Sequence, residues 1–383
     1  MPSIIKPRHP YQGNTTKSLL LLLPMLLISV LVISGGSFNI ESWKDCVTSV
    51  LTFLLFNVLF FLMVYTGKTD KYRSVLFAIL AVFFCVSFMS NLVELRGTVN
   101  YSDDDILGCD IPFCHIVTTM IIIPMAVKQT IIFPGQITGH YAAIASMLVF
   151  VIGAALALGR GFCSWACFYG GWDDASSRIL KKPVIRNVSR RLRFLSFAIL
   201  VAVAVTSALE MAPEYCTWLC PFKAVTESEQ ITGAWSVIRT VIFWALFLGL
   251  AIVLPLLTKK RVQCATFCPM GALMSLTNKI NVFEVTVEKD TCVRCGKCVK
   301  NCPMLSLGME DVQKGRVGLT CSKCGKCVDA CPTGAIHYHI KGTPKDRLKG
   351  TARILFLYAA FLFLMFFCTG YVKEMLNLLL SLI

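Results

Sequence analysis

The residues best suited to chemistry are eight cysteines that repeat one spacing, C-x2-C-x2-C-x3-C-P, twice. Thiolates at these intervals ligate 4Fe-4S clusters, and in two-cluster ferredoxins the fourth cysteine of each run ligates the other cluster. This rule assigns one cluster to Cys292, Cys295, Cys298 and Cys331, and the second to Cys321, Cys324, Cys327 and Cys302. Zinc knuckles also use C-x2-C spacing. The doubled run, with a proline after each fourth cysteine, favours iron–sulfur clusters.

Six further cysteines form three C-x3-C pairs, each at the end of an apolar stretch. The pairs are Cys163 and Cys167, Cys216 and Cys220, and Cys264 and Cys268. Residues i and i+4 of a helical turn point to the same side, so each pair can offer two thiolates to one metal centre. Two pairs therefore suffice for one cluster. The alternative is a set of ordinary buried thiols, which both the spacing and the position disfavour.

The composition places these cysteines in a membrane protein. Hydrophobic residues make up 56% of the 383 residues and the mean hydropathy is +0.68, whereas soluble proteins are about 45–50% apolar. The formal net charge is +15, but the basic residues cluster beside apolar stretches. This pattern indicates cytoplasmic loops of a membrane protein and argues against nucleic acid as a partner.

Seven stretches are long and apolar enough to span a bilayer, which takes about 20 residues. They are residues 19–33, 46–66, 75–93, 141–159, 194–209, 237–257 and 354–368. An eighth stretch, residues 111–133, contains Pro112, Pro124 and Lys128. A single crossing there would put the basic residues 160–193 outside the cell, against the charge rule. We therefore expect it to form a buried re-entrant segment on the outer side.

The expected fold is an all-α polytopic membrane protein with about seven transmembrane helices, the re-entrant segment and a small α+β two-cluster ferredoxin-like insert. The expected domains are residues 1–102 with the N-terminal transmembrane helices, 103–280 with the re-entrant segment and the C-x3-C motifs, 281–345 with the insert, and 346–383 with a C-terminal helix and tail. The basic loops place the insert in the cytoplasm and the chain in a bacterial inner membrane.

This topology sorts the C-x3-C pairs between the two membrane faces. Cys163, Cys167, Cys264 and Cys268 emerge on the cytoplasmic side, where they are expected to hold a third 4Fe-4S cluster below the insert. Cys216 and Cys220 fall on the outer side together with Cys109 and Cys114, and a fourth cluster is one interpretation of these four residues. Because an exterior compartment is oxidising, disulfides or unpaired thiols are the alternative.

The remaining polar residues form no catalytic constellation, and none is assigned a catalytic role. His115, beside the re-entrant segment, is expected as a polar residue at a helix end, with a haem ligand as the alternative. His337 and His339 follow the last cluster cysteine and are expected on the surface of the insert. Asp173 and Asp174 are expected as solvated loop charges near the membrane boundary.

The apolar spans, the C-x3-C-P motifs at residues 216–221 and 264–269, and the doubled ferredoxin run together resemble the NapH/NosR/CcoG-type membrane polyferredoxins. The similarity covers about residues 159–338, and Phe168 stands where the family has a proline. The resemblance implies an electron-transfer partner of quinol-linked respiratory reductases or of metal-centre maturation.

The expected function is membrane-bound iron–sulfur electron transfer from a cytoplasmic or quinol donor to a membrane or periplasmic acceptor. The chain would be an electron carrier or a subunit of a membrane oxidoreductase, with 4Fe-4S clusters as cofactors and quinone as a further candidate. Its expected partners are the lipid bilayer and a redox protein or complex subunits, with a quinol as another candidate. Two alternatives are a maturation reductase for a metal centre of another enzyme and an iron–sulfur redox sensor.

Overall fold

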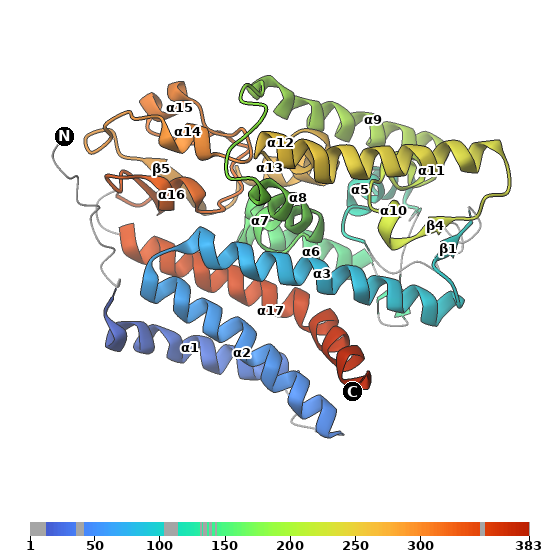
Figure 1. Ribbon diagram of the computed structural model, residues 1–383, viewed down its shortest axis with the longest axis horizontal. Coiled ribbons are helices and arrows are strands. Elements are labelled where there is room, and N and C mark those ends of the chain that lie inside the picture. The colour runs from blue at the N-terminus through green and yellow to red at the C-terminus, as the bar shows by residue number, and fades with distance from the viewer. Residues whose placement is uncertain are drawn as a thin grey trace.

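A computed structural model (Figure 1) describes residues 13–35, 42–102, 114–130, 132, 136–137, 140–141, 144–344 and 349–382. Within these residues, six helical stretches are long and apolar enough to cross a membrane. They are α1 (Thr15–Ile33), α2 (Trp43–Thr66), α3 (Thr69–Arg96), Arg190–Glu210 with α9 (Leu195–Glu210), Ala234–Thr258 with α11 (Ala234–Leu246) and α12 (Leu254–Thr258), and Gly350–Ser381 in α17 (Lys349–Ser381). The predicted helical, multi-pass fold is confirmed.

Two shorter apolar helices depart from a simple set of spans. α6 (Ile144–Ala157) is bent by 101° against residues Gly159–Trp165, which lead into α7 (Phe162–Trp165). The span predicted for residues 141–159 therefore corresponds to the first arm of a sharply bent helix pair, which is either a broken span or a re-entrant loop. α5 (Thr118–Lys128) has 11 residues, about half of what a bilayer needs, and belongs to the expected re-entrant stretch, which is described only in part.

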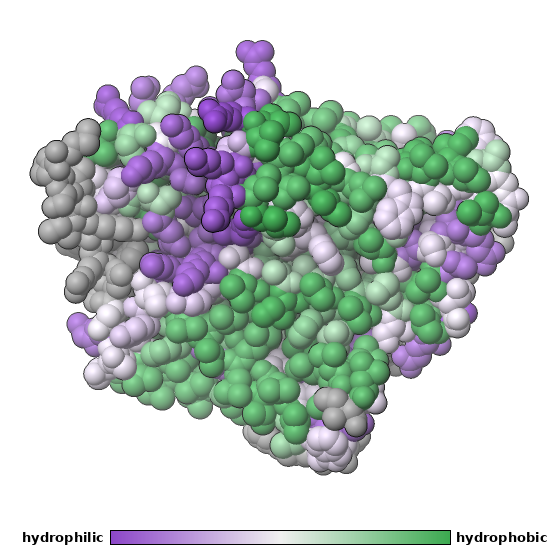
Figure 2. Space-filling view, in the orientation of Figure 1, coloured by the Kyte–Doolittle hydropathy of each residue, from purple (hydrophilic) through white to green (hydrophobic). Residues whose placement is uncertain are grey.

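The outer surface of the helices is apolar. Figure 2 shows a continuous hydrophobic face over the helical part, with hydrophilic side chains gathered at the end that carries α14 and α15. Leu27, Val149 and Phe366 are each about 70% exposed. Apolar patches of this size are unfavourable in water and mark a surface that contacts lipid or protein.

The ferredoxin unit, residues 281–344, is a small α+β element at one end of the helices. Strand β5 (Phe283–Val287) pairs antiparallel with β6 (Ile336–Ile340). Its short helices are α14 (Lys297–Asn301), α15 (Met309–Lys314) and α16 (Lys326–Ala330). Gly296 and Gly325 precede α14 and α16 with φ of 69° and 83°, a left-handed conformation in which glycine has no steric cost.

His337 and His339 are buried on β6, so their predicted surface position is wrong. Side chains alternate between the two faces of a strand, so both histidines lie on the face opposite Tyr338, whose ring stacks on Phe356 of α17 at 4.9 Å. His337 Nε2 lies 3.3 Å from the Thr286 hydroxyl across the sheet. The short distance in sequence from the last cluster cysteine does not predict that these histidines are buried by tertiary contacts.

Several membrane helices end against the ferredoxin unit (Figure 1). At the start of α3, the Asp70 backbone N–H donates to Asp329 Oδ2 at 2.8 Å. After α12, Lys260 Nζ donates to the carbonyl of Cys302 at 2.8 Å. Before α9, Arg190 pairs with Asp311 at 2.5 Å. The unit is therefore fixed to the membrane helices by polar contacts at three separate points.

Candidate iron–sulfur sites

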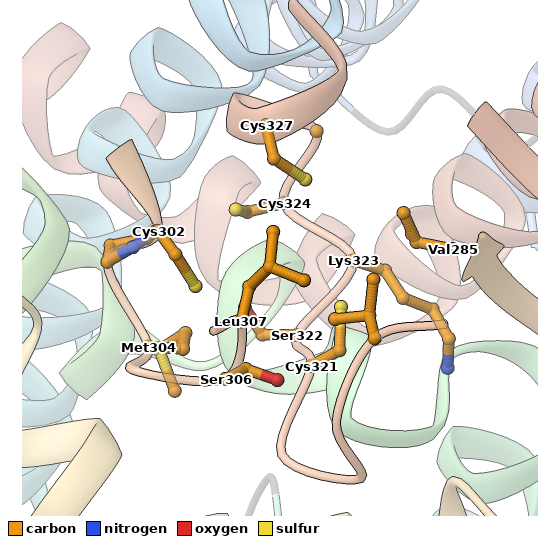
Figure 3. Close-up of a pocket in the computed structure, with 13 residues that line it drawn as sticks. Val285, Cys302, Met304, Ser306, Leu307, Cys321, Ser322, Lys323, Cys324 and Cys327 are labelled. Carbon is orange, nitrogen blue, oxygen red and sulfur yellow. The ribbon is translucent and has the colours of Figure 1, made fainter. Parts of the chain in front are cut away.

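Two cavities in the ferredoxin unit are each lined by four cysteines. Site I is lined by Cys292, Cys295, Cys298 and Cys331, and site II by Cys302, Cys321, Cys324 and Cys327. Figure 3 shows the four thiols of site II surrounding one space. Each cavity takes three cysteines from one run and the fourth from the other, which is the crossed arrangement of two-cluster ferredoxins. The geometry suits 4Fe-4S clusters, and ligation itself stays a prediction.

The polar groups around site II are deeply buried. Burial raises the pKa of the Cys321 thiol to about 12, so an incoming iron centre must displace its proton. Burial also lowers the pKa of Lys323 to about 7. The Lys323 ammonium donates to the carbonyl of Leu158 at 2.9 Å and to Asn278 Oδ1 at 2.7 Å. This lysine links the unit to the bend after α6.

Site III combines the two C-x3-C pairs nearest the ferredoxin unit. Cys163 lies in α7 and Cys264 in the π-helical turn Gln263–Phe267. The second cysteines, Cys167 and Cys268, have extended backbones with ψ of 118° and 121°, and each immediately precedes a helix, α8 (Phe168–Ile179) or α13 (Pro269–Thr277). The expected placement of both thiolates on one uninterrupted helical turn is therefore wrong.

The helix that begins after each second cysteine supplies donors to its sulfur. The backbone N–H of Gly170 donates to Cys167, and those of Met270 and Gly271 donate to Cys268. Free N–H groups at a helix N-terminus favour an anion. The local fold thus stabilises the thiolate form of the second cysteine, which is the form that binds metal.

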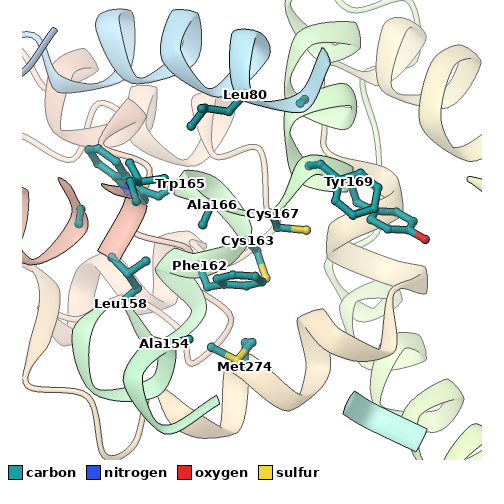
Figure 4. Packing of buried hydrophobic residues seen from close by; sticks show 14 of the residues in the cluster. Leu80, Ala154, Leu158, Phe162, Cys163, Trp165, Ala166, Cys167, Tyr169 and Met274 are labelled. Carbon is teal, nitrogen blue, oxygen red and sulfur yellow. The ribbon is translucent and has the colours of Figure 1, made fainter. Parts of the chain in front are cut away.

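Hydrogen bonds from two arginines connect the two segments of site III. Arg160 Nη2 donates to the carbonyl of Cys264 at 3.0 Å, and Arg261 Nη2 donates to the carbonyl of Cys163 at 2.5 Å. Each arginine stands three residues before the first cysteine of its own pair and binds the first cysteine of the other. The exchange holds the four thiols together, and Figure 4 shows the α7 side, with Cys163 and Cys167 among buried rings.

Within each segment, a glycine permits the chain to pack closely on the first cysteine of its own pair. A Cβ atom on Gly170 would lie 2.1 Å from the carbonyl oxygen of Cys163, and one on Gly271 would lie 2.8 Å from that of Cys264. Both distances are below van der Waals contact. The motif that builds site III is therefore R-x2-C-x3-C-x2-G, present at residues 160–170 and again at 261–271. The repeated arginine and glycine were visible in the sequence, but the cysteine spacing alone did not draw attention to them.

Site III is rich in buried positive charge. Arg160 and Arg261 are both fully buried. Arg160 donates to the Ser275 hydroxyl at 2.6 Å and to a carbonyl, and no carboxylate pairs with it in the described part of the chain. A buried guanidinium without a counter-charge is costly. An anionic cluster held by four thiolates would supply that charge, so the donor set fits such a group.

Asp173 and Asp174 are buried beside site III, so the prediction of solvated loop charges is wrong. Asp173 Oδ2 accepts from the backbone N–H of Cys264 at 2.8 Å, and Asp174 pairs with the buried Arg73 at 3.1 Å. Residues 168–179 form helix α8, which packs along α3, so these side chains face protein rather than solvent.

Site IV is a cavity lined by Cys114, Cys216 and Cys220 together with Tyr169, Lys223, Glu227 and apolar side chains. Cys220 repeats the local geometry of site III, since it has ψ of 109° after the π-helical turn Tyr215–Leu219 and accepts from the N–H groups of Phe222 and Lys223. Cys109, the fourth predicted ligand, lies outside the described residues. The structure thus places Cys114 in the same cavity as Cys216 and Cys220.

Packing connects site I to site II and site II to site III. Helix α14, which carries Cys298 of site I, packs against α16, which carries Cys327 of site II. Met304 forms one buried cluster with Ala265 and with Cys264 of site III, and Cys302 of site II packs against this cluster. The hydroxyls of Ser164 and Ser322 lie 2.7 Å apart between the same two sites. The ferredoxin unit and the membrane helices are thus in direct contact between sites II and III.

Two side chains connect site III to site IV. His115 Nε2 lies 3.1 Å from the sulfur of Cys167, and His115 directly follows Cys114 in the chain. The Tyr169 hydroxyl lies 2.8 Å from the sulfur of Cys220 and belongs to the same turn as Cys167. The polar helix-end role expected for His115 missed this contact with a cysteine. Nothing in the local sequence marks it, because residues 115 and 167 are brought together only by the fold.

Comparisons with known proteins agree with these sites. A 4Fe-4S dicluster domain matches residues 284–332, and a 4Fe-4S binding domain matches residues 140–186, 192–229 and 240–284, each holding one C-x3-C pair. Similar proteins include YccM of Escherichia coli (strain K12), named as an electron transport protein, at 23% identity over 44% of this chain and 48% of the relative. The ferredoxin-type protein MauN of Paracoccus denitrificans (strain Pd 1222) is 28% identical over 38% of this chain and 48% of the relative. The ferredoxin-type protein NapH of Escherichia coli (strain K12) is 28% identical over 43% of this chain and 56% of the relative.

The chain thus spans about half the length of these relatives, and no solved structure matches it. The helical membrane fold and the 4Fe-4S domains define a multi-pass iron–sulfur protein. The chain is similar to ferredoxin-type membrane proteins of the NapH/NosR kind, as its motifs indicated. The matches support a role in electron transfer.

Proposed function

We propose that the chain relays electrons through four 4Fe-4S clusters, held at sites I to IV in that order. The observation that carries this proposal is the unbroken line of thiol groups. The cluster that contains Met304 and Cys264 packs against Cys302 between sites II and III, and Tyr169 and His115 connect sites III and IV. The clusters would supply the redox chemistry, while the chain holds them close together, excludes water and sets their potentials by hydrogen bonds and burial.

The line of sites shortens the distance that electrons must cross. The hydrocarbon core of a bilayer is about 30 Å thick, and the basic loops favour a cytoplasmic ferredoxin unit. Sites III and IV carry the path from that unit into the helices, and α5 runs from site IV to the opposite end of α9, where Lys128 Nζ donates to the Ala208 carbonyl at 2.8 Å. The acceptor would then be reached within the membrane or on its outer face.

Cluster counts in the purified full-length chain test this proposal. We expect about 16 iron and 16 sulfide per chain, four of each per cluster. Cys163→Ala with Cys264→Ala should remove about a quarter of the iron, and the EPR signal of site IV should then no longer follow reduction of site I. Cys216→Ala with Cys220→Ala should also remove a quarter but leave the site III signal intact.

The matched control is Cys46→Ala, because Cys46 is exposed and outside every cysteine group, and it should keep the full iron count. Cys109→Ala tests the ligand that lies outside the described residues, and it should weaken site IV alone. A wild-type count of only two clusters would confine the chemistry to the ferredoxin unit and overturn the relay.

A further inference from the structure

Site I is the most exposed of the four cysteine groups. Cys295 is exposed and Cys292 is half-buried, whereas no cysteine of site II is exposed and all four of site III are buried. Next to it, the side chains of Val293 and Met309 are 54% and 37% exposed. Met309 lies against the site I loop, since its sulfur is 3.8 Å from where a Cβ on Gly296 would be. Site I therefore opens onto a small apolar patch.

The exposed charge of the ferredoxin unit is mostly basic. In the described part of the unit, the exposed charged residues are six basic ones, Lys289, Arg294, Lys297, Lys300, Lys314 and Arg316, and two acidic ones, Asp290 and Glu310. The excess is four positive charges (six minus two). Lys297 and Lys300 are three residues apart on α14, so they project from the same helix face.

We propose that this face docks an acidic, one-electron carrier protein of the flavodoxin or ferredoxin class, which exchanges electrons with site I. The inference rests on the proposed electron relay and adds the class of its soluble partner. One electron passes between the carrier and the cluster held at site I, so the carrier changes its oxidation state by one and the cluster changes in the opposite sense. No proton or further reactant is required.

The chemistry of the face fits a transient protein contact. Complexes of electron-transfer proteins bury little surface, below about 1,200 Å², and a small apolar centre with charged surroundings matches that size. Opposite charges on the two partners raise the association rate without requiring tight binding. A lipid surface is the competing explanation for basic residues, but α14 and α15 lie beyond the ends of α9 and α12 in Figure 1, away from the apolar face that contacts lipid.

Stopped-flow reduction by a purified acidic flavodoxin in its hydroquinone state tests this docking surface. The full chain is placed in nanodiscs of uncharged lipid. The test variant is Lys289→Glu with Lys297→Glu and Lys300→Glu, whose side chains touch no cysteine. At low salt we expect the second-order rate constant to fall about 10- to 100-fold. For the wild type, the rate constant should decrease as salt is added, and for the variant it should not.

The charge-matched control is Lys181→Glu with Lys182→Glu and Arg186→Glu. These exposed residues belong to the segment beside α12, where the Val184 N–H donates to the Leu257 carbonyl. This control should react like the wild type, because its charge change lies away from site I. Equal rates for the wild type and the test variant would overturn the proposal. So would a loss of binding to phosphatidylserine vesicles as the only effect of the test variant.

Reduced methyl viologen separates this proposal from the electron relay. The small dye needs no docking surface, so it should reduce the clusters equally in all three proteins. If the dye reduces the clusters while flavodoxin is slow with the wild type, the docking proposal fails and the relay stands. If the dye also fails to reduce them, the relay itself fails.

Discussion

Sites III and IV use the same local geometry but are assembled differently. Site III is made from the R-x2-C-x3-C-x2-G motif used twice, and the two copies exchange hydrogen bonds through Arg160 and Arg261. Site IV has one C-x3-C pair, with Pro213 in place of the arginine and Lys223 in place of the glycine. Its third cysteine, Cys114, comes from the segment before α5.

This difference shows that two sites with the same local backbone geometry can carry different charges around their cysteines. At site III the arginines are buried and Arg160 has no carboxylate partner in the described residues. At site IV the ammonium of Lys223 lies 3.4 Å from Glu227, so its charge is already balanced. Nearby positive charge stabilises the more reduced, more negative state of a cluster. We expect site III to have a higher midpoint potential than site IV.

The largest effect is expected from removing an exchanged arginine. Arg261→Met deletes the bonds to the Cys163 carbonyl and the Ser164 hydroxyl and leaves Asp173 buried with less compensation. Removing one partner of a buried charged pair costs about 3–5 kcal/mol. Thermal unfolding in detergent should show this loss, and EPR should show site III missing or shifted to lower potential while site IV keeps its signal.

Arg186→Met is the control for this change, since Arg186 is exposed. It should leave both the unfolding temperature and the EPR spectra unchanged. An Arg261→Met protein with a normal site III potential would show that the arginine has no electrostatic influence on that site, and the expected order of the two potentials would lose its basis.

A somewhat smaller effect is expected from filling the glycine contact. Gly170→Ala puts a methyl group 2.1 Å from the Cys163 carbonyl, and overpacking of this kind costs about 3 kcal/mol. Gly271→Ala, at 2.8 Å from the Cys264 carbonyl, should cost less. Iron content per chain and unfolding temperature measure both. Gly249→Ala is the control, because nothing lies within 4 Å of its added Cβ. If all three variants behave alike, the close packing of each glycine on the first cysteine of its own motif is not required.

The smallest effect concerns the link between the two sites. Tyr169→Phe removes the hydroxyl that lies 2.8 Å from the Cys220 sulfur. A single hydrogen bond contributes about 1 kcal/mol, which for a one-electron couple corresponds to about 40 mV. Redox-titrated EPR should show the site IV potential lowered by that amount and the site III potential unchanged. The control is Tyr358→Phe, remote from every cysteine group, which should shift neither potential. If Tyr169→Phe shifts the potential of site III instead, the hydroxyl acts on site III and not on site IV.

The sequence predicted the features that depend on spacing. The crossed grouping of the ferredoxin cysteines follows from a short repeat, and the helical membrane fold follows from the length of apolar stretches. The association of Cys163 and Cys167 with Cys264 and Cys268 followed from loop charge, which sorts segments to one side of a membrane. Each of these features depends on cysteine spacing, apolar length or loop charge, which can be read from the sequence without knowing the tertiary contacts.

The features that the sequence did not reveal depend on packing between segments that are far apart in the sequence. His337 and Asp173 looked like surface residues because both are polar and lie close to chain turns, yet His337 is buried on β6 and Asp173 is buried on α8, which packs along α3. The bend after α6 was missed because residues 141–159 are apolar throughout. The contact between His115 and Cys167 joins segments 52 residues apart, and no periodicity encodes it.

The bonds between the ferredoxin unit and the helices also bear on how fast electrons can move. The carbonyls of Cys321, Lys323 and Cys324 accept from Asn278, Trp165 and Arg73, at 2.8, 3.3 and 3.1 Å. Site II is therefore held at a constant separation from site III and does not have to swing on a tether. Transfer between them should be insensitive to solvent viscosity, so that thick glycerol solutions slow the arrival of a soluble carrier but not the internal step.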